Sequence, residues 1–246
     1  MKNKQVKKEG ASQTRVRSIF CYGNEDIKKM IWSLKTDRRF FDSENGKKLM
    51  ERLWNEIQNN KGEGGVGGVA SKTIIICAPS SSFWQSRKNF DHMHVSMKAC
   101  VKNWRSVIKP AQVPVSTQMP TMWPTTAPIL NTEVKYVPYS IIPKLNKSLQ
   151  KGLNKKDRQK QSSGAYGLSN YFKHFLRYHF FNKNKRSAIP NWNILIIDDV
   201  KTTGSTLNEC SHIVENYIEG LLDKYGFISQ QQTKIIIKCL TIAYEA

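Results

Sequence analysis

In the C-terminal third of the chain, the apolar residues predict a strand, a helix and a second strand in succession, an order that few folds accommodate. Residues 194–197 are all apolar and predict a buried strand, and residues 234–243 predict a second one. Between them, a helix expected to begin at Thr206 carries its apolar residues on one stripe. Because strand, helix and strand follow one another, the two strands should be parallel and joined by a right-handed crossover, which predicts an α/β fold.

Further elements of the same core are predicted upstream. Residues 73–78 are almost continuously apolar, as expected for a parallel strand covered on both faces, and residues 134–139 suggest another short strand. Helices are expected near residues 89–107 and 168–181. Thr206 and Glu209 form a capping-box pattern, which predicts where the long C-terminal helix begins.

The segments around this core are predicted to have different characters. Residues 19–57 show helical spacing of apolar side chains, so a helical hood is expected there. The 246 residues are accordingly divided into a basic disordered tail (1–17), the hood (18–60), a Gly-rich linker (61–72) and the core (73–246), which contains an irregular Pro-rich insertion (109–143).

Two patterns that suggest a cofactor or metal site lack the context such a site needs. Gly62, Gly64 and Gly67 satisfy a dinucleotide-binding pattern, but they precede a strand, so a flexible linker is the better interpretation. His92 and His94 are two residues apart in a predicted helix, which places them on different faces and argues against a shared metal ion.

The cysteines point to a reduced protein. There are five, an odd number, and none belongs to a CxxC pair, which argues against a zinc ribbon and a disulfide scaffold. Cys77, Cys210 and Cys239 lie in apolar patterns and are predicted to be buried free thiols, which fits the cytoplasm. No apolar run approaches the roughly 18–20 residues of a membrane span, so no membrane partner is expected.

The charge is strongly basic, with 39 Lys and Arg against 19 Asp and Glu and a net charge of +20. Such an excess suggests nucleic acid, because Lys and Arg neutralise phosphates. The basic residues are nevertheless spread along the chain, and Lys outnumbers Arg, the residue that makes bidentate contacts. We therefore expect affinity for anions such as phosphorylated metabolites, with at most a weak nucleic-acid contact.

Chemistry is expected in the segment that follows the strand at residues 194–197. Asp198 and Asp199 come directly after it, at the sheet edge where α/β proteins bind ligands. The next loop ends at a helix N-terminus, which favours an anion, and its hydroxyl groups add donors. A phosphate cradle beside two hydroxyl acceptors fits a ribose 5-phosphate, and the sequence has no GxxxxGK[ST] P-loop. The alternative is a capped helix with two incidental aspartates. The cradle comprises Thr202, Thr203, Gly204, Ser205 and Thr206.

The segment ILIIDDVKTTGST resembles the signature by which type I phosphoribosyltransferases bind phosphoribosyl pyrophosphate (PRPP). The resemblance implies the parallel sheet of that family with an N-terminal helical hood. It also implies that Asp198 and Asp199 hold the ribose 2- and 3-hydroxyls and that residues 201–206 bind the 5-phosphate. Lys201 departs from a position that is usually apolar. Thr202 replaces the acid of the 6-oxopurine enzymes, which argues against hypoxanthine–guanine salvage.

Elsewhere the chain resembles the ComF-like, competence-associated branch of that family. Residues 88–92 are similar to its Arg-Gly-Phe-Asn-Gln run, with only Phe90 identical. The insertion at 109–143 has no counterpart, and the four-cysteine zinc module is absent from this sequence. The remaining matches are Tyr22, Ile31, Leu34 and Lys35 in the opening helix, Pro79 and the serines after it at the pyrophosphate loop, and Arg158 with Gln161 in a mobile basic loop.

The resemblance implies a reaction in which an unknown acceptor displaces pyrophosphate from C1 of PRPP. Mg²⁺ would bridge pyrophosphate and ribose oxygens, with no direct protein ligand, while Asp198 and Asp199 orient the hydroxyls. Residues 144–170 would close as a lid. Trp32 and Trp54 of the hood could face the acceptor, although core packing is their more ordinary use. Pyrophosphate would be held by Pro79, Ser80, Arg87, Lys88 and Arg158.

Three functions remain open at this point. The first is a catalytic phosphoribosyltransferase, and the second is a non-catalytic PRPP- or nucleotide-binding protein, which the departures at residues 88–92 favour. The third, a competence-type protein linked to DNA uptake, follows from the basic charge and from analogy. A homodimer is left open as well. Asp199→Asn is expected to weaken PRPP binding and to leave the ligand-free fold intact.

Overall fold

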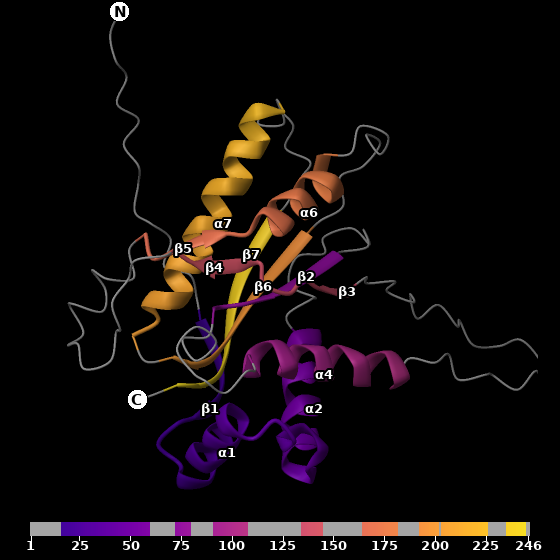
Figure 1. Ribbon diagram of the computed structural model, residues 1–246, viewed down its shortest axis with the longest axis vertical. Helices are drawn as coiled ribbons and strands as arrows, with labels where there is room; N and C mark the ends of the chain where they lie inside the picture. Colours follow the sequence, from indigo (N-terminus) through magenta and orange to yellow (C-terminus); the bar gives the residue numbers. More distant parts are fainter. Residues whose placement is uncertain are drawn as a thin grey trace, which may run out of the picture.

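Five parallel strands form the centre of the protein, and helices cover both faces of the sheet (Figure 1). The computed structural model describes residues 16–59, 72–79, 91–107, 134–144, 164–181, 192–201, 203–225 and 235–244. The strand order across the sheet is β1–β7–β6–β2–β3. This confirms the predicted α/β fold with a parallel sheet. The strands are β1 (Val16–Cys21), β2 (Lys72–Cys77), β3 (Val134–Tyr136), β6 (Trp192–Lys201) and β7 (Ile235–Tyr244).

Each face of the sheet has its own apolar core. Successive residues of β2 alternate between the two cores, so that Ile75 packs on one side while Ile74 and Ile76 pack on the other. Burial on both faces explains why this strand is almost continuously apolar. In Figure 1, α1 (Glu25–Thr36), α2 (Glu44–Asn59) and α4 (His92–Val107) lie below the sheet, and α6 (Asn170–Phe181) and α7 (Ser205–Lys224) lie above it.

Smaller elements complete the described chain. A 3-10 helix, η1 (Phe40–Asp42), links α1 to α2. A separate antiparallel pair, β4 (Ile141–Pro143) and β5 (Tyr166–Leu168), packs beside α7. The expected irregular insertion therefore ends in regular structure, since β3 and β4 both fall within residues 134–143. Residues 109–133 of that insertion lie outside the described residues.

The first described residues form a strand, which corrects the expected tail and helix at this point. Val16 and Arg17 belong to β1, and so do Ile19 to Cys21, for which a helix was expected. β1 pairs with β7, and the hydroxyl oxygens of Ser18 and Thr241 lie 2.6 Å apart. The strand lies at the sheet edge and is only partly buried, so its sequence lacks the clear alternation by which strands are recognised.

Other predicted elements are confirmed. α4 and α6 lie where helices were expected, and the apolar stripe of α7 is buried at Leu207, Cys210, Val214, Ile218 and Leu221. None of the helices in the described part of the chain is both long enough and apolar enough to cross a membrane.

The cysteines are all free thiols in the structure. Cys210 and Cys239 are buried as predicted, whereas Cys77, at the end of β2, is only half-buried. Burial raises the pKa of the Cys239 thiol to about 12, so this side chain is an inert part of the core at neutral pH.

Candidate functional site

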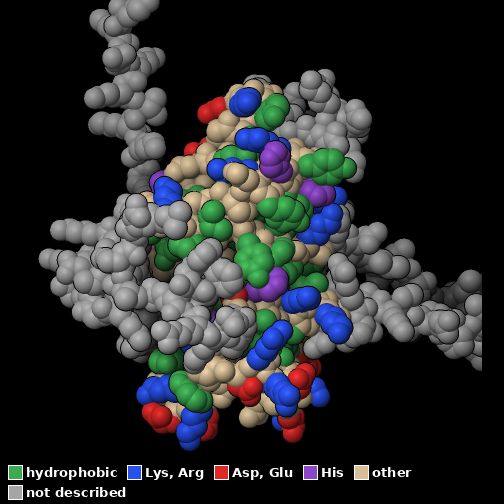
Figure 2. All heavy atoms as spheres, viewed as in Figure 1, with side chains coloured by type: hydrophobic (Ala, Val, Ile, Leu, Met, Phe, Trp, Pro, Cys, Tyr) green, Lys and Arg blue, Asp and Glu red, His purple; other side chains and the backbone are tan. Residues whose placement is uncertain are grey.

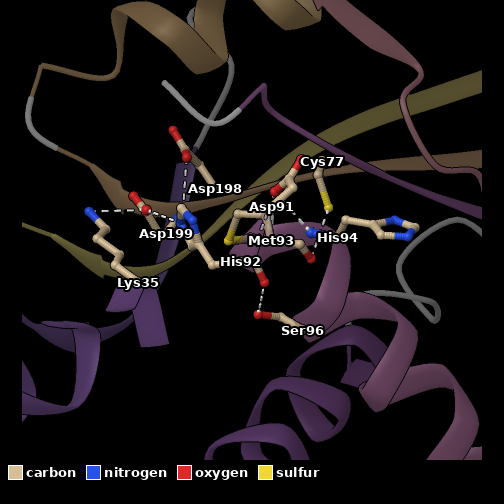
Figure 3. Close-up of polar contacts among 9 residues, drawn as sticks. All are labelled: Lys35, Cys77, Asp91, His92, Met93, His94, Ser96, Asp198 and Asp199. Carbon is tan, nitrogen blue, oxygen red and sulfur yellow. Dashed lines mark hydrogen bonds and ion pairs between the residues drawn. The ribbon is translucent and has the colours of Figure 1, made fainter. Parts of the chain in front are cut away.

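Asp198 and Asp199 lie near the C-terminal edge of the sheet, on strand β6 (Figure 3). The strand continues through Lys201, which pairs with Tyr244 of β7. Lys201 is thus a strand residue, which corrects its expected place in the phosphate loop. Because side chains alternate along a strand, the two carboxylates lie on opposite faces of the sheet and meet different surroundings.

Asp199 faces α1 and α4, and two basic side chains reach the same carboxylate oxygen. Nε2 of His92 lies 2.6 Å from Oδ2 of Asp199, and Nζ of Lys35 lies 3.0 Å from it. Burial would raise the pKa of Asp199, but the hydrogen bond with His92 and the charge of Lys35 outweigh burial and hold this pKa below its ordinary value. Asp199 is therefore a fixed anion at neutral pH.

Hydrogen bonds at the start of α4 hold His92 in place. The Asp91 carboxylate accepts from the backbone N–H groups of Met93, at 3.0 Å, and His94, at 3.2 Å, and so caps the helix. Ser96 donates its hydroxyl to the His92 carbonyl at 2.6 Å. The His92 side chain is 3% exposed, and Figure 3 shows it directed at Asp199.

Asp198 has a different environment. Burial and the charge of Asp199 raise the pKa of Asp198 to about 7, although its Oδ1 accepts a hydrogen bond from the Asp199 backbone N–H at 2.9 Å. Within the described residues, no Lys or Arg forms an ion pair with Asp198. Asp199 is thus ionised and paired with basic side chains, whereas Asp198 gains or loses a proton near neutral pH.

The loop after β6 leads into α7 through Gly204, whose φ of 73° lies in the left-handed region that favours glycine. The Thr203 hydroxyl accepts from the Ser205 backbone N–H at 3.3 Å and donates to the Ser205 hydroxyl at 2.9 Å. The N-terminal backbone N–H groups of the 20-residue helix α7 therefore lie beside a turn that carries the hydroxyls of Thr203 and Ser205.

The predicted capping box at Thr206 is wrong. α7 begins at Ser205, and Gly204 occupies the N-cap position without a side-chain hydrogen bond. Glu209, the expected second member of the box, accepts instead from the backbone N–H of Gly164 at 2.6 Å. Glu209 thus ties α7 to Gly164, two residues before β5, a long-range contact that local spacing does not reveal.

Tyr166 of β5 contacts the first turn of α7. Its hydroxyl forms a hydrogen bond with Thr206 and senses the charge of Asp198. Burial chiefly raises the pKa of Tyr166, and the hydrogen bond with Thr206 opposes it. A lone tyrosine in a three-residue strand carries no local signal, so the sequence does not point to this residue.

A second polar group lies at the ends of β2 and β3. Nδ1 of His94 is 2.8 Å from the Tyr136 hydroxyl, and its ring stacks on Tyr139 at 4.8 Å. Burial lowers the pKa of His94, which keeps its imidazole neutral. His92 and His94 thus point to different partners, as the helical spacing predicted. The described residues contain no group of three or more His, Cys, Asp or Glu side chains that could hold a metal ion.

Pro79 is the one predicted pyrophosphate-binding residue that the structure describes. It comes two residues after the end of β2, the strand that pairs with β6. Just before it, the Ala78 N–H donates to the Ile197 carbonyl of β6 at 2.8 Å. Of the two tryptophans, Trp54 packs partly against the core, whereas Trp32 is 68% exposed, so its predicted core packing is wrong. Predicted site residues outside the described residues are Ser80, Arg87, Lys88, Arg158 and Thr202.

The hood helices carry acidic side chains among their basic ones. Lys28 pairs with Glu25 at 2.7 Å, and Lys48 pairs with Glu44 at 2.6 Å. Figure 2 shows red and blue side chains mixed over these lower helices. The positive charge on this part of the surface is therefore interrupted, and no single basic patch forms there.

We expect Gly204→Ala to destabilise the protein by about 1 kcal/mol, because a left-handed φ strains an alanine. Gly220, near the C-terminal end of the same helix, offers the matched control, since a Cβ there meets no atom within 4 Å. Gly220→Ala should stabilise by roughly 0.5–1 kcal/mol through helix propensity. Chemical denaturation of both variants measures the two effects, and equal signs would contradict the assignment of Gly204 as a strained turn.

A comparison with models of protein families finds no match, and neither does a search of curated proteins. What the protein does must therefore be inferred from its own geometry. The relevant features are the adjacent carboxylates of β6, the turn at Gly204 and the N-terminus of α7, which share one edge of the parallel sheet.

Proposed function

We propose that the protein is a PRPP-dependent phosphoribosyltransferase of the type I fold, with an acceptor still to be identified. The observation that carries this proposal is the short path from Asp198 and Asp199 on β6, through the left-handed turn at Gly204, to the N-terminus of α7. Hydroxyl acceptors and an anion site are thereby separated by a few residues, a spacing that suits a ribose bearing a 5-phosphate.

The order of elements supports the same proposal. β2 runs beside β6 and ends in Pro79, where a pyrophosphate loop would begin. β4 ends just before the segment 144–170 that is expected to act as a lid, and its partner β5 lies within that segment, of which residues 145–163 lie outside the described residues. α1 and α2 pack on the sheet face that Asp199 faces, the position in which a hood would contribute to an acceptor site.

In this proposal Asp198 and Asp199 accept hydrogen bonds from the ribose hydroxyls. The backbone N–H groups at the start of α7 bind the 5-phosphate, together with the hydroxyls of Thr203, Ser205 and Thr206. The bond between C1 and the pyrophosphate oxygen breaks, and a bond from C1 to the acceptor forms, so the protein contributes mainly positioning and electrostatics.

The donor set suits a metal carried by the substrate better than one held by the protein. Oδ2 of Asp199 already contacts Lys35 and His92, so the carboxylates are placed to orient hydroxyls. Mg²⁺, when bound together with PRPP, would neutralise the charge of the leaving group. This leaves Asp198 and Asp199 to fix the ribose.

The first test is ligand-induced stabilisation. PRPP with Mg²⁺ at millimolar concentration should raise the melting temperature by about 2–5 °C, because a ligand that binds only the folded state stabilises it by mass action. Differential scanning fluorimetry would measure the shift, with pyrophosphate plus Mg²⁺ as the control ligand. An unchanged melting temperature with PRPP would remove the proposal.

Binding and catalysis are separated by a second measurement. Release of pyrophosphate from PRPP in the presence of a panel of nucleobases and amines would show turnover. Stabilisation by PRPP without release for any acceptor would favour a non-catalytic PRPP-binding protein.

A further inference from the structure

Two residues outside the aspartate segment converge on Asp199. Lys35 comes from the last turn of α1 and His92 from the first turn of α4, and both contact Oδ2. Lys35 is partly exposed, whereas His92 is 3% exposed and buried beneath the carboxylate. We call Lys35 and His92 the Asp199 clamp.

The clamp leaves the two oxygens of Asp199 unequal. Oδ2 is occupied by both basic groups, so Oδ1 is the oxygen that can accept a hydrogen bond from a ligand. Lys35 contacts Asp199 from α1, and His92 contacts it from α4. Because a change in the side-chain rotamer of Asp199 would break at least one of these contacts, they fix the rotamer. Asp198, which has no such cation partner among the described residues, lacks this constraint.

Charge makes the clamp necessary at this position. Asp198 is the adjacent residue, and two partly buried carboxylates so close together repel each other, which favours protonation of one of them. The titratable groups that act on Asp199 are Lys35 from α1, His92 from α4 and Asp198, the preceding residue of its own strand. Without Lys35, the pair would lose one of the two contacts that keep Asp199 ionised.

We propose that the Asp199 clamp positions Asp199 as the fixed anionic acceptor for the vicinal hydroxyls of a pentose 5-phosphate, so that Lys35 and His92 determine affinity for the hydroxyls without touching the ligand. This inference rests on the proposed function, because it assumes that a pentose 5-phosphate occupies the site. Lys35 and His92 are positioning residues in this scheme, and the phosphate cradle at α7 is independent of them.

Isothermal titration of Lys35→Met with ribose 5-phosphate, 2-deoxyribose 5-phosphate and inorganic phosphate tests the inference. Methionine keeps an apolar stem at the end of α1 and removes the charge. We expect affinity for ribose 5-phosphate to fall by about tenfold, because a hydrogen bond to a fixed anion is weakened. Affinity for 2-deoxyribose 5-phosphate should fall less, and that for inorganic phosphate should stay within about twofold.

Matched variants separate positioning from a general effect on the fold. Lys28→Met makes the same change on the same helix, at a partly exposed residue that pairs with Glu25, and should bind all three ligands like the wild type. Lys35→Arg restores the charge and should recover most of the affinity for ribose 5-phosphate. His92→Gln should show the same ligand selectivity as Lys35→Met.

The possible outcomes have separate meanings. Unchanged or tighter binding of ribose 5-phosphate by Lys35→Met would overturn the clamp, and so would an equal loss of affinity for all three ligands. A lack of rescue by Lys35→Arg, with that variant folded, would overturn it too. Failure of the wild type itself to bind ribose 5-phosphate would remove the proposed function, and the clamp with it, whereas the other outcomes leave that function standing.

Discussion

Asp198→Asn is expected to make the protein more stable than the wild type at pH 8, although the substitution removes half of the candidate hydroxyl-binding pair. Ionised Asp198 is desolvated and lies next to a second carboxylate, which is why its pKa rises to about 7. Asparagine has no charge to desolvate, and its amide oxygen can still accept the hydrogen bond that the Asp199 N–H donates to Oδ1.

The effect should depend on pH in a defined direction. A carboxyl whose folded-state pKa is raised stabilises the fold below its unfolded value, near pH 4, and loses that contribution as the pH rises through about 7. A pKa of about 7 in place of 3.8 corresponds to ~4 kcal/mol, which partial solvent access reduces to about 2–3 kcal/mol. Asp198→Asn should therefore match the wild type near pH 4 and exceed it at pH 8.

Urea denaturation at pH 4.5 and pH 8 measures this difference. Asp42→Asn is the control, because it makes the same chemical change at an exposed position of η1 and should leave the free energy of unfolding nearly unchanged. A lower stability of Asp198→Asn at pH 8 would mean that Asp198 has a cation partner in the folded protein. Gain of stability with loss of PRPP binding is the pattern expected of a functional group held in an unfavourable place.

Asp199→Asn should have the opposite sign. It removes the charge that Lys35 and His92 share, and we expect the free energy of unfolding at pH 7 to fall by about 2 kcal/mol, less than for a fully buried pair because Lys35 is partly exposed. The PRPP-induced rise in melting temperature should disappear. This revises the expectation from sequence alone that the ligand-free fold would be unaffected.

The pH dependence again provides a check. Because the pKa of Asp199 is lowered, its stabilising contribution is present above the unfolded value near pH 4 and is lost as the pH falls through the folded-state pKa. The difference between Asp199→Asn and the wild type should thus be largest near neutral pH and shrink under acid conditions. If Asp199→Asn is as stable as the wild type at pH 7, the contacts with Lys35 and His92 do not stabilise the fold.

The parallel sheet and its helices were predictable because their signals are local. The centres of β2 and β6, residues 74–77 and 194–197, are apolar without interruption because these strands are buried on both faces. The apolar stripe of α7 spans many turns because one face of the helix is buried. β1 was missed because a half-buried edge strand shows neither pattern. The start of α7 was misplaced because Gly204 provides the turn by its backbone conformation, without a side-chain cap.

The candidate site was predictable only along the chain. Asp198, Asp199 and the turn before α7 are consecutive, so their spacing carried the prediction. No spacing along the chain links Lys35 or His92 to Asp199, since the contact between His92 and Asp199 spans 107 residues. Which strand and helix ends meet at one sheet edge is a property of topology, and local periodicity contains no information about it.

The strand order has a consequence for how the chain reaches its folded state. β7 is the last described strand in sequence, yet it lies between β1, the first, and β6. The hydroxyl contact between Ser18 and Thr241 joins residues 223 positions apart. At roughly 5–20 residues per second, β1 would leave the ribosome about 10–45 seconds before β7 exists to pair with it. During translation β1 must therefore remain without its partner, and the sheet closes last at the edge that β1 forms.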